Sequence, residues 1–357
     1  MVVSSSISSS RRRGSKWAFL AAILAFGGLN AALLAAAPYF DSNYLLMEDI
    51  NSGVWQPGAD ILILGDSRSH QGVVPPTLSA ELDRYGLKAT AINLARPGQQ
   101  LPFMHYFANR VLEQAEIKPE AVLLNISFYL LGGQQWMKDI YTAYYRPTLG
   151  EATLACSTRL LNCVEAAEWF TSTRLPAVTF RSRLNTLIKK SVTDLPGAQN
   201  EISSIQEQRE AMRFAVAQGY MTRGNDHISS DDVPMPHGYS TGIENGYSVY
   251  LNYFDRMVQS LTSRGVEVFV YQFPWPEQRK DEPGFQEVLA YYDQLLEAHG
   301  GSNVHFLPTY RFWSTEFFVD PLHLNEAGAQ RLSRELATEL ALHPDFQRLF
   351  GQKVASN

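Results

Sequence analysis

The hydrophobic pattern divides the chain into an apolar N-terminal stretch and a longer region where short apolar runs alternate with amphipathic segments. The stretch 17–37 carries no charged side chain, and Asn30 is its one strongly polar residue. At about 1.5 Å of rise per residue, a helix of this length spans roughly 30 Å, the thickness of a bilayer's hydrocarbon core. The pattern therefore predicts one membrane-spanning helix.

The flanks of this stretch predict its orientation. Residues 1–16 contain four basic side chains and no acidic one. The positive-inside rule therefore places 1–16 in the cytoplasm as a short tail and everything beyond 37 outside. A cleaved signal peptide is the alternative, because 35–37 has the small-residue look of a cleavage site, although the apolar run is long for one and Pro38 follows directly. Both interpretations make the body of the protein extracytoplasmic, periplasmic or extracellular.

Beyond a connector at 38–57, the chain alternates short apolar runs that stop at Gly or Pro with segments of helical periodicity. This alternation predicts an α/β domain over 58–345, with a parallel sheet covered on both faces, and a C-terminal tail at 346–357. The expected strands are 59–64, 89–94, 121–128, 266–273 and 304–307, and the expected helices are 75–86, 101–115, 247–263, 285–299 and 325–342.

The alternation is interrupted between about 132 and 242. An insertion this long inside a domain is usually functional or a small subdomain, and we expect a lid or cap. It contains both cysteines, Cys156 and Cys163. In one continuous helix their Cα atoms would lie about 10 Å apart, too far for a disulfide. A bridge, which an extracytoplasmic location permits, thus requires a break in the helix, and free thiols are the alternative.

Composition narrows the function classes. Hydrophobic residues make up 45% of the chain, which suits a folded domain rather than a disordered one. The net charge is −6, and since the first 16 residues carry +4, the remainder carries −10. Nucleic-acid binding needs a basic surface, so an acidic body argues against a nucleic-acid partner.

Gly65, Asp66 and Ser67 follow directly after the first predicted strand. A serine there lies at the carboxyl edge of the sheet, where open α/β folds bind ligands. The backbone N–H groups of a following helix would face an anion, which suits an attacking serine and the oxyanion that it forms. The tripeptide alone is equally compatible with an ordinary turn.

A second polar motif, Asp320-Pro321-Leu322-His323, stands just before the last predicted helix, and Asn325 is the expected N-cap of that helix. A nucleophilic serine needs a base within hydrogen-bond reach, and the base needs an orienting group. One short loop can supply both.

The two motifs together resemble the first and last blocks of the SGNH or GDSL-type hydrolases: ILILGDSRS at 61–69 and DPLHLNEAG at 320–328. The resemblance implies a flavodoxin-like three-layer α/β/α fold. It also implies a catalytic triad in which Ser67 is the nucleophile, His323 the general base and then acid, and Asp320 the orienting carboxylate.

The middle blocks resemble the family less closely. NLARPG at 93–98 is similar to the second block, which implies that Gly98 donates its backbone N–H to the oxyanion; a plain turn is the alternative. The third block normally reads Gly-x-Asn-Asp, whereas this chain has Asn125 in LNISF, so Asn125 is a candidate side-chain donor. Arg68 replaces the family's Leu, and it either contacts an anionic or sugar substrate or is a partly exposed side chain at a helix start.

Other polar residues have simpler interpretations. His70 either lines the site or, as we expect, faces solvent. His227 and His237 lack a recognised metal-ligand spacing, and neither a metal nor a cofactor is expected. Trp275, next to Phe273, is expected to be packed rather than to stack on a sugar.

The triad chemistry predicts acyl transfer through a serine ester. The anchor and the insertion resemble SGNH-type proteins such as the alginate O-acetyltransferase and lipoteichoic acid D-alanylation proteins. That resemblance implies an O-acyltransferase, with an exopolysaccharide or envelope glycan as substrate and a membrane-bound acyl-transporting acyltransferase as partner. An envelope esterase or deacetylase is the first alternative, and a non-catalytic envelope binding module is the second.

Overall fold

The computed structural model of the chain describes residues 10–40, 59–114, 119–126, 145–179, 243–280, 298, 303–307 and 311–351. Its centre is a five-stranded parallel sheet with the order β2-β1-β3-β4-β6. The strands are β1 (Ile61–Leu64), β2 (Ala91–Asn93), β3 (Ala121–Asn125), β4 (Glu267–Tyr271) and β6 (Val304–Phe306). Because successive connections leave β1 in opposite directions, its carboxyl end is a switch point, where open sheets of this kind bind ligands.

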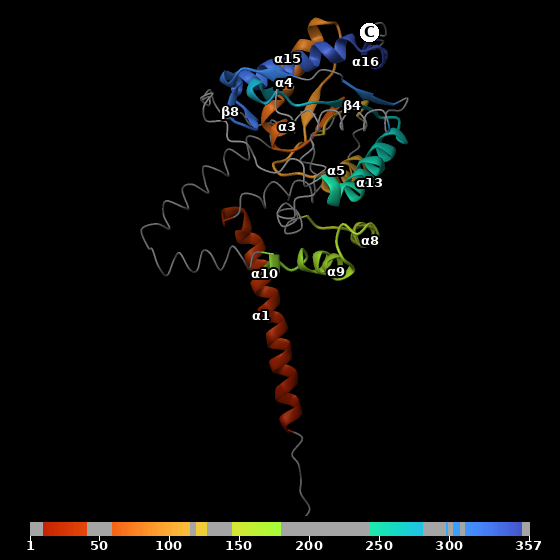
Figure 1. The fold of residues 1–357 in the computed structure, drawn as a ribbon. Coiled ribbons are helices and arrows are strands. Elements are labelled where there is room, and N and C mark those ends of the chain that lie inside the picture. Colours follow the sequence, from red (N-terminus) through yellow and green to blue (C-terminus); the bar gives the residue numbers. More distant parts are fainter. Residues whose placement is uncertain are drawn as a thin grey trace, which may run out of the picture.

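Helices cover both faces of the sheet (Figure 1). The apolar run of β1 is buried throughout and alternates between the two layers, as its two-residue period requires. Ile61 and Ile63 pack with α4 (Pro75–Arg84), α15 (Glu326–Leu342) and α16 (Pro344–Phe350). Leu62 and Leu64 pack with α5 (Leu101–Gln114) and α13 (Ile243–Thr262). The predicted α/β class with a covered parallel sheet is confirmed.

The expected strands and helices agree with the structure to within a few residues wherever it describes them, and the expected helix at 285–299 lies almost wholly outside the described residues. One boundary was wrong. The tail predicted from 346 is helical as far as Phe350, because Phe346 and Phe350 are fully buried against the α15 side of the sheet. The folded domain therefore continues to the end of α16.

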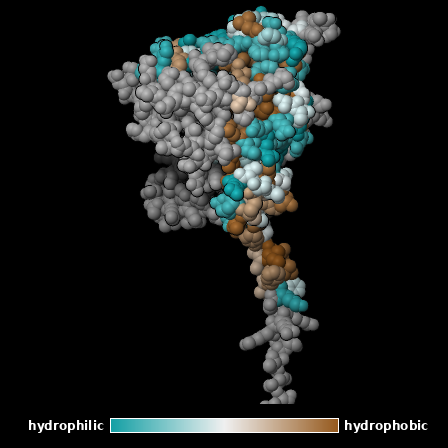
Figure 2. Space-filling view, turned by 45° about the vertical axis from the view of Figure 1, so that its right-hand side comes forward, coloured by the Kyte–Doolittle hydropathy of each residue, from teal (hydrophilic) through white to brown (hydrophobic). Residues whose placement is uncertain are grey.

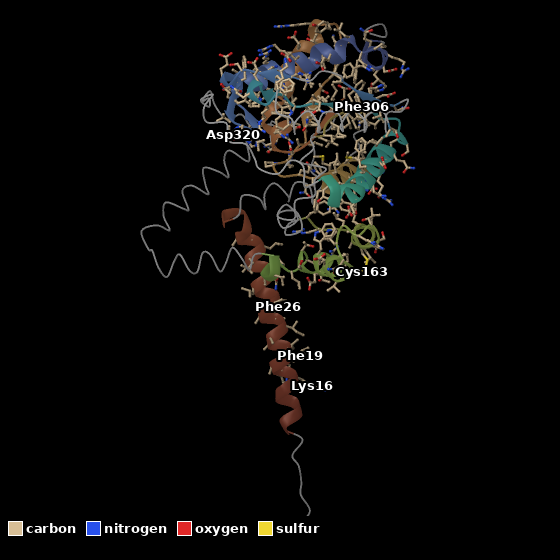
Figure 3. All side chains as sticks on the ribbon, in the orientation of Figure 1. Lys16, Phe19, Phe26, Cys163, Phe306 and Asp320 are labelled. Atoms are coloured by element: carbon tan, nitrogen blue, oxygen red, sulfur yellow. A yellow bond between two sulfur atoms is a disulfide. The ribbon has the colours of Figure 1, made fainter. Side chains whose placement is uncertain are left out.

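The N-terminal helix α1 (Ser10–Phe40) extends away from the sheet domain. Within the described residues it is the one helix long and apolar enough to cross a membrane, over Lys16–Ala36. Figure 2 shows its largely brown apolar surface below a body whose coloured part mixes teal, white and brown, and Figure 3 shows the side chains of Phe19 and Phe26 projecting from it. This agrees with the predicted span, while its orientation across a membrane stays a prediction.

Part of the insertion, 145–179, is helical and lies between α1 and the α5–α13 face. It contains α8 (Leu149–Ser157), α9 (Cys163–Ser172) and α10 (Pro176–Thr179), and Trp169 of α9 packs in the same core as α5 and α13. At α10, the backbone N–H of Ala177 donates to Asn30 Oδ1 of α1 at 2.9 Å. Figure 3 shows Cys163 of this layer well away from Asp320. The rest of the predicted cap lies outside the described residues.

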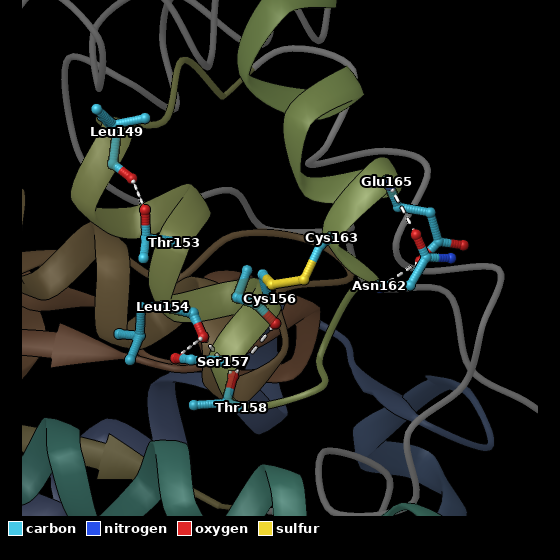
Figure 4. The surroundings of a disulfide bond; sticks show 10 residues. Leu149, Thr153, Leu154, Cys156, Ser157, Thr158, Asn162, Cys163 and Glu165 are labelled. Atoms are coloured by element: carbon cyan, nitrogen blue, oxygen red, sulfur yellow. Dashed lines mark hydrogen bonds between the residues drawn. A yellow bond between two sulfur atoms is a disulfide. The ribbon is translucent and has the colours of Figure 1, made fainter.

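The two cysteines form a disulfide, and their Cα atoms are 4.7 Å apart (Figure 4). The approach is possible because α8 ends at Ser157 and α9 starts only at Cys163. The turn between them contains Arg159 with a positive φ of 60°. The break that the sequence required for a bridge is therefore present, and a disulfide suits an oxidising, extracytoplasmic compartment.

Candidate active site

Ser67 is the first residue of α3 (Ser67–Gly72), which is separated from the end of β1 by the two residues Gly65 and Asp66. Asp66 is the N-cap of this helix, and its side chain accepts a hydrogen bond from the backbone N–H of Arg68 at 3.0 Å. Gly65 is needed between strand and helix, because a Cβ there would lie 2.1 Å from Ser69 Oγ. The strand, the glycine and the cap together present Ser67 at the carboxyl edge of the sheet.

Asp320 and His323 come from a small antiparallel hairpin, β8 (Phe318–Asp320) and β9 (His323–Leu324), directly before α15. Asp320 Oδ1 accepts the backbone N–H groups of Leu322 at 2.9 Å and His323 at 3.0 Å. The carboxylate therefore shapes the turn that carries its own histidine. Asn325 caps α15 as predicted, its Oδ1 accepting from the N–H of Gly328 at 3.0 Å.

The structure brings the three predicted side chains into one hydrogen-bonded chain. Ser67 Oγ lies 2.8 Å from His323 Nε2, and His323 Nδ1 lies 2.9 and 2.8 Å from the two oxygens of Asp320. With Nδ1–H donating to the carboxylate, Nε2 is free to accept the serine proton. The side chain of His323 is 15% exposed and that of Asp320 is 34% exposed, so the site opens to solvent on the hairpin side.

The segment after β2 runs beside the nucleophile turn. The N–H of Leu94 donates to Ile63 O at 2.8 Å, and the N–H of Arg96 donates to Gly65 O at 3.2 Å. Two residues further on, Gly98 has a φ of 71°, a conformation that favours glycine. The turn expected at Gly98 is therefore present. The donation of its backbone N–H to an oxyanion stays a prediction.

Asn125 ends β3, the strand next to β1, and is fully buried. Its Nδ2 donates to the carbonyl of Tyr271 on β4 at 3.2 Å. Its Cβ lies near the Gly65 turn, since a Cβ added to Gly65 would be 3.2 Å from it. Asn125 is therefore beside the segment that carries Ser67, and its hydrogen bond to Tyr271 ties it to the sheet. Its donation to an oxyanion stays a prediction.

Arg68, next to Ser67, is buried rather than partly exposed. It is 3% exposed, and its Nε and Nη2 donate to the Asp66 carboxylate, with Nη2 to Oδ2 at 2.6 Å. Its guanidinium also lies 5.6 Å from the Trp275 ring and 5.9 Å from the Phe273 ring. The expectation of a partly exposed helix-start residue was wrong. A substrate contact by Arg68 stays a prediction.

His70 was also placed wrongly by the sequence, because it is fully buried rather than facing solvent. Burial, together with the charge of the neighbouring Arg96, lowers the pKa of His70 to about 3, against a smaller opposite effect of the Ala95 backbone. His70 is therefore neutral at ordinary pH. Trp275 is buried, as expected for a packed side chain.

Two buried polar residues that sequence reasoning missed hold the nucleophile helix. Asn93 Nδ2 donates to the carbonyls of Ser69 at 2.8 Å and Val73 at 2.9 Å, while its Oδ1 accepts from the N–H of Ala95. The hydroxyl of Tyr271 donates to Ser69 Oγ at 2.9 Å. The position of Asn93 at the end of a predicted strand was the available signal; Tyr271 gave none, since it stands in an ordinary apolar run.

Comparison with known proteins adds little. No protein-family model matches the chain, and no curated protein matches it. Among solved structures, one named "putative platelet activating factor" from Streptococcus pneumonia aligns with 90% of this chain and 99% of its own, at 13% identity and a TM-score of 0.39. A likeness this distant indicates nothing about activity.

Proposed function

We propose that this chain is an extracytoplasmic serine acyl-transfer enzyme of the SGNH type, most simply an O-acyltransferase of an exopolysaccharide or envelope glycan. The observation that carries the proposal is the hydrogen-bonded chain from Ser67 through His323 to Asp320 at the carboxyl edge of the sheet. It supplies a nucleophile, a base and an orienting carboxylate within contact distance, which is the requirement for nucleophilic acyl transfer.

In the first half-reaction, Ser67 Oγ attacks the carbonyl carbon of an acyl donor while His323 Nε2 takes the hydroxyl proton. Asp320 stabilises the imidazolium and holds Nδ1–H toward itself. The tetrahedral oxyanion then collapses, the bond to the donor's leaving group breaks, and His323 returns the proton to that group. The product is an ester between the acyl group and Ser67 Oγ.

In the second half-reaction, an acceptor hydroxyl loses its proton to His323 Nε2 and attacks the acyl carbon. The new ester forms, the bond to Ser67 Oγ breaks, and the proton passes from His323 to the serine. Backbone N–H groups at the start of α3, with that of Gly98, are the proposed stabilisers of both oxyanions. Neither half-reaction calls for a cofactor.

The identity of the acceptor decides between the two enzymatic alternatives. Water as the acceptor gives an envelope esterase or deacetylase, and a sugar hydroxyl gives a transferase. The apolar helix α1 favours the transferase, because a membrane tether keeps the site beside a membrane-bound acyl donor protein. A non-catalytic binding module is disfavoured, since binding alone does not need a serine, a histidine and a carboxylate in hydrogen-bond register.

The test uses the full chain in detergent with p-nitrophenyl acetate as the donor. After a brief reaction, peptide mass spectrometry should find an acetyl group on Ser67, and the Ser67→Ala protein should show none. Adding oligosaccharides from an acidic exopolysaccharide should then move acetyl groups to the sugar faster than to water. Release to water alone would favour the esterase, and the absence of acetyl-Ser67 in the folded protein would favour the binding module.

A further inference from the structure

A second group of titratable side chains lies far from the triad, where the edge strand β6 meets the junction of α15 and α16. His305 is the middle residue of β6, and His343 and Asp345 belong to the α15–α16 junction. One ligand atom from each of these three residues lies within 4.8 Å of the others. We call this group the β6–α16 cluster.

The distances within the cluster approach those of a metal centre. Asp345 Oδ2 lies 3.5 Å from His305 Nδ1 and 3.9 Å from His343 Nδ1. In a tetrahedral zinc site with bonds of about 2.1 Å, two ligand atoms are about 3.4 Å apart. The Asp345–His305 separation already matches this value, whereas the His343 ring must move closer to the other two ligands, because the three ligand atoms are only within 4.8 Å of one another.

His305 has the second contact that a metal-binding histidine usually makes. Its other ring nitrogen, Nε2, lies 2.8 Å from Oε2 of Glu267, whose side chain is 8% exposed. A carboxylate on the distant nitrogen fixes the tautomer, so that Nδ1 carries a lone pair and is the nitrogen offered to a metal. Phe269 packs on both imidazoles, stacked on His305 with ring centroids at 4.8 Å and edge-on to His343 at 5.2 Å.

His343 has a ring nitrogen that is available to a metal ion. Its Nδ1 is a buried atom that has no hydrogen-bond partner among the described residues, and it faces the Asp345 carboxylate. A buried polar nitrogen without a partner is costly, and a metal ion would satisfy it. The side chains of His343 and Asp345 are otherwise partly exposed, so a fourth ligand can be water.

Among the described residues, Arg348 is the cation that contacts the carboxylates of the cluster, and it contacts their outer oxygens. Its Nη2 lies 3.0 Å from Asp345 Oδ1 and 3.4 Å from Glu267 Oε1, while the other oxygen of each carboxylate faces a histidine. With neutral imidazoles, the two carboxylates and this arginine sum to a net charge of −1. That remaining negative charge favours a divalent cation over an empty site.

We propose that His305, His343 and Asp345 bind a divalent transition-metal ion of the zinc type, with Glu267 as the outer carboxylate. Two imidazoles and one carboxylate are the donor set that zinc accepts, with water completing the coordination. The ion fastens the end of α15 and the start of α16 to the edge of the sheet. The site is independent of the acyl-transfer proposal, because the triad lies at the other end of α15.

The test is a titration of the untagged, chelator-treated full chain in detergent with Co²⁺, followed by its visible absorption. One equivalent should give the absorption of a four-coordinate site, and Zn²⁺ should abolish it. His343→Gln should weaken binding by at least about 100-fold, and Glu267→Gln by about 10- to 100-fold. His343 suits this substitution because its side chain makes no capping bond to α16.

Asp83→Asn, which removes an exposed carboxylate on α4, is the matched control and should bind Co²⁺ like the unaltered chain. Zn²⁺ should also raise the thermal midpoint of the chain and of this control, but not that of His343→Gln. Absence of Co²⁺ absorption, or absorption retained in full by His343→Gln, would overturn the proposal.

Discussion

The two halves of the candidate active site are held in contrasting ways, although they meet side by side in Figure 1 near α3 and β8. The nucleophile stands on a helix whose following residues are buried and tied to distant strands through Asn93 and Tyr271. The base stands on a short hairpin and is oriented by a carboxylate only three residues away. The nucleophile thus depends on the fold as a whole, whereas the base depends on its own loop.

The hairpin half should therefore lose activity without losing stability. In Asp320→Asn, the side-chain oxygen can still accept the N–H groups of Leu322 and His323, so the turn keeps its shape. The amide no longer holds His323 in the tautomer that accepts a proton from Ser67, and we expect kcat to fall by about 10⁴-fold. Ester hydrolysis measured beside the thermal midpoint checks this. A large fall in the midpoint would contradict the local character of this half.

The helix half should behave in the opposite way. In Asp66→Asn, the N-cap oxygen remains, but the buried guanidinium of Arg68 loses its carboxylate. Removing one partner of a buried pair typically costs about 3–5 kcal/mol, so the free energy of unfolding should drop by this order. The comparison with Asp320→Asn is matched, since both are Asp-to-Asn changes near the triad. Equal stability of the two variants would show that the distinction between the halves is wrong.

The buried histidine of the helix half predicts a pH effect. His70 has a pKa of about 3 in the folded chain and about 6.5 when unfolded, so between these values the unfolded chain binds more protons. Stability should therefore be full above pH 6.5 and should fall as the pH drops toward 3. Replacing His70 by Gln should make this slope shallower by up to about 1.4 kcal/mol per pH unit.

Thermal unfolding between pH 4 and 7 measures this slope. His105 is a suitable control, because burial lowers its pKa too, to about 4. It lies on α5 and not on the helix that carries Ser67. His105→Gln should change the slope but leave ester hydrolysis at pH 7 intact. An unchanged slope in His70→Gln would contradict the buried, neutral state of His70.

The smallest effect concerns the hydroxyl of Tyr271. Tyr271→Phe removes its bond to Ser69 Oγ, two residues after the nucleophile, and should cost about 1 kcal/mol together with a modest loss of kcat. Tyr250→Phe is the control, because it removes a comparable buried bond to Gln100 Oε1 on the α13 side. It should cost similar stability and leave kcat unchanged. Equal kcat in both variants would show that the hydroxyl of Tyr271 does not help to position Ser67.

Features that depend on local sequence were predictable, whereas features that depend on the whole fold were not. Ser67, Asp320 and His323 were predicted because two short motifs, each weak alone, together resemble the blocks of one hydrolase family. The strands were predicted because buried apolar runs are continuous. The burial of Arg68 and His70 was not predictable, because it depends on Asp66, Arg96 and the aromatic rings that the fold brings around them.

The β6–α16 cluster shows the same limit. Its side chains come from distant parts of the sequence. The span from Glu267, the first residue of β4, through His305 to His343, at the end of α15, covers 77 positions, so no short sequence motif marks these residues as a site. Only the pairing of β4 with β6 and the return of α15 along the sheet bring them together. The disulfide was partly predictable. The spacing of the cysteines showed that a bridge needs a break in the helix, but only the structure shows that the break is present.

Labelling with a fluorophosphonate serine probe shows whether His323 activates Ser67, because only an activated serine reacts with the probe. The full chain in detergent is treated with the probe and the modified peptide is located by mass spectrometry, beside the His323→Ala protein and a folded Asp83→Asn control. We predict that the probe attaches to Ser67 in the unaltered chain and in the control, and that labelling is lost without His323. Labelling of Ser67 that persists without His323, or no labelling in the folded chain, would show that His323 does not activate Ser67.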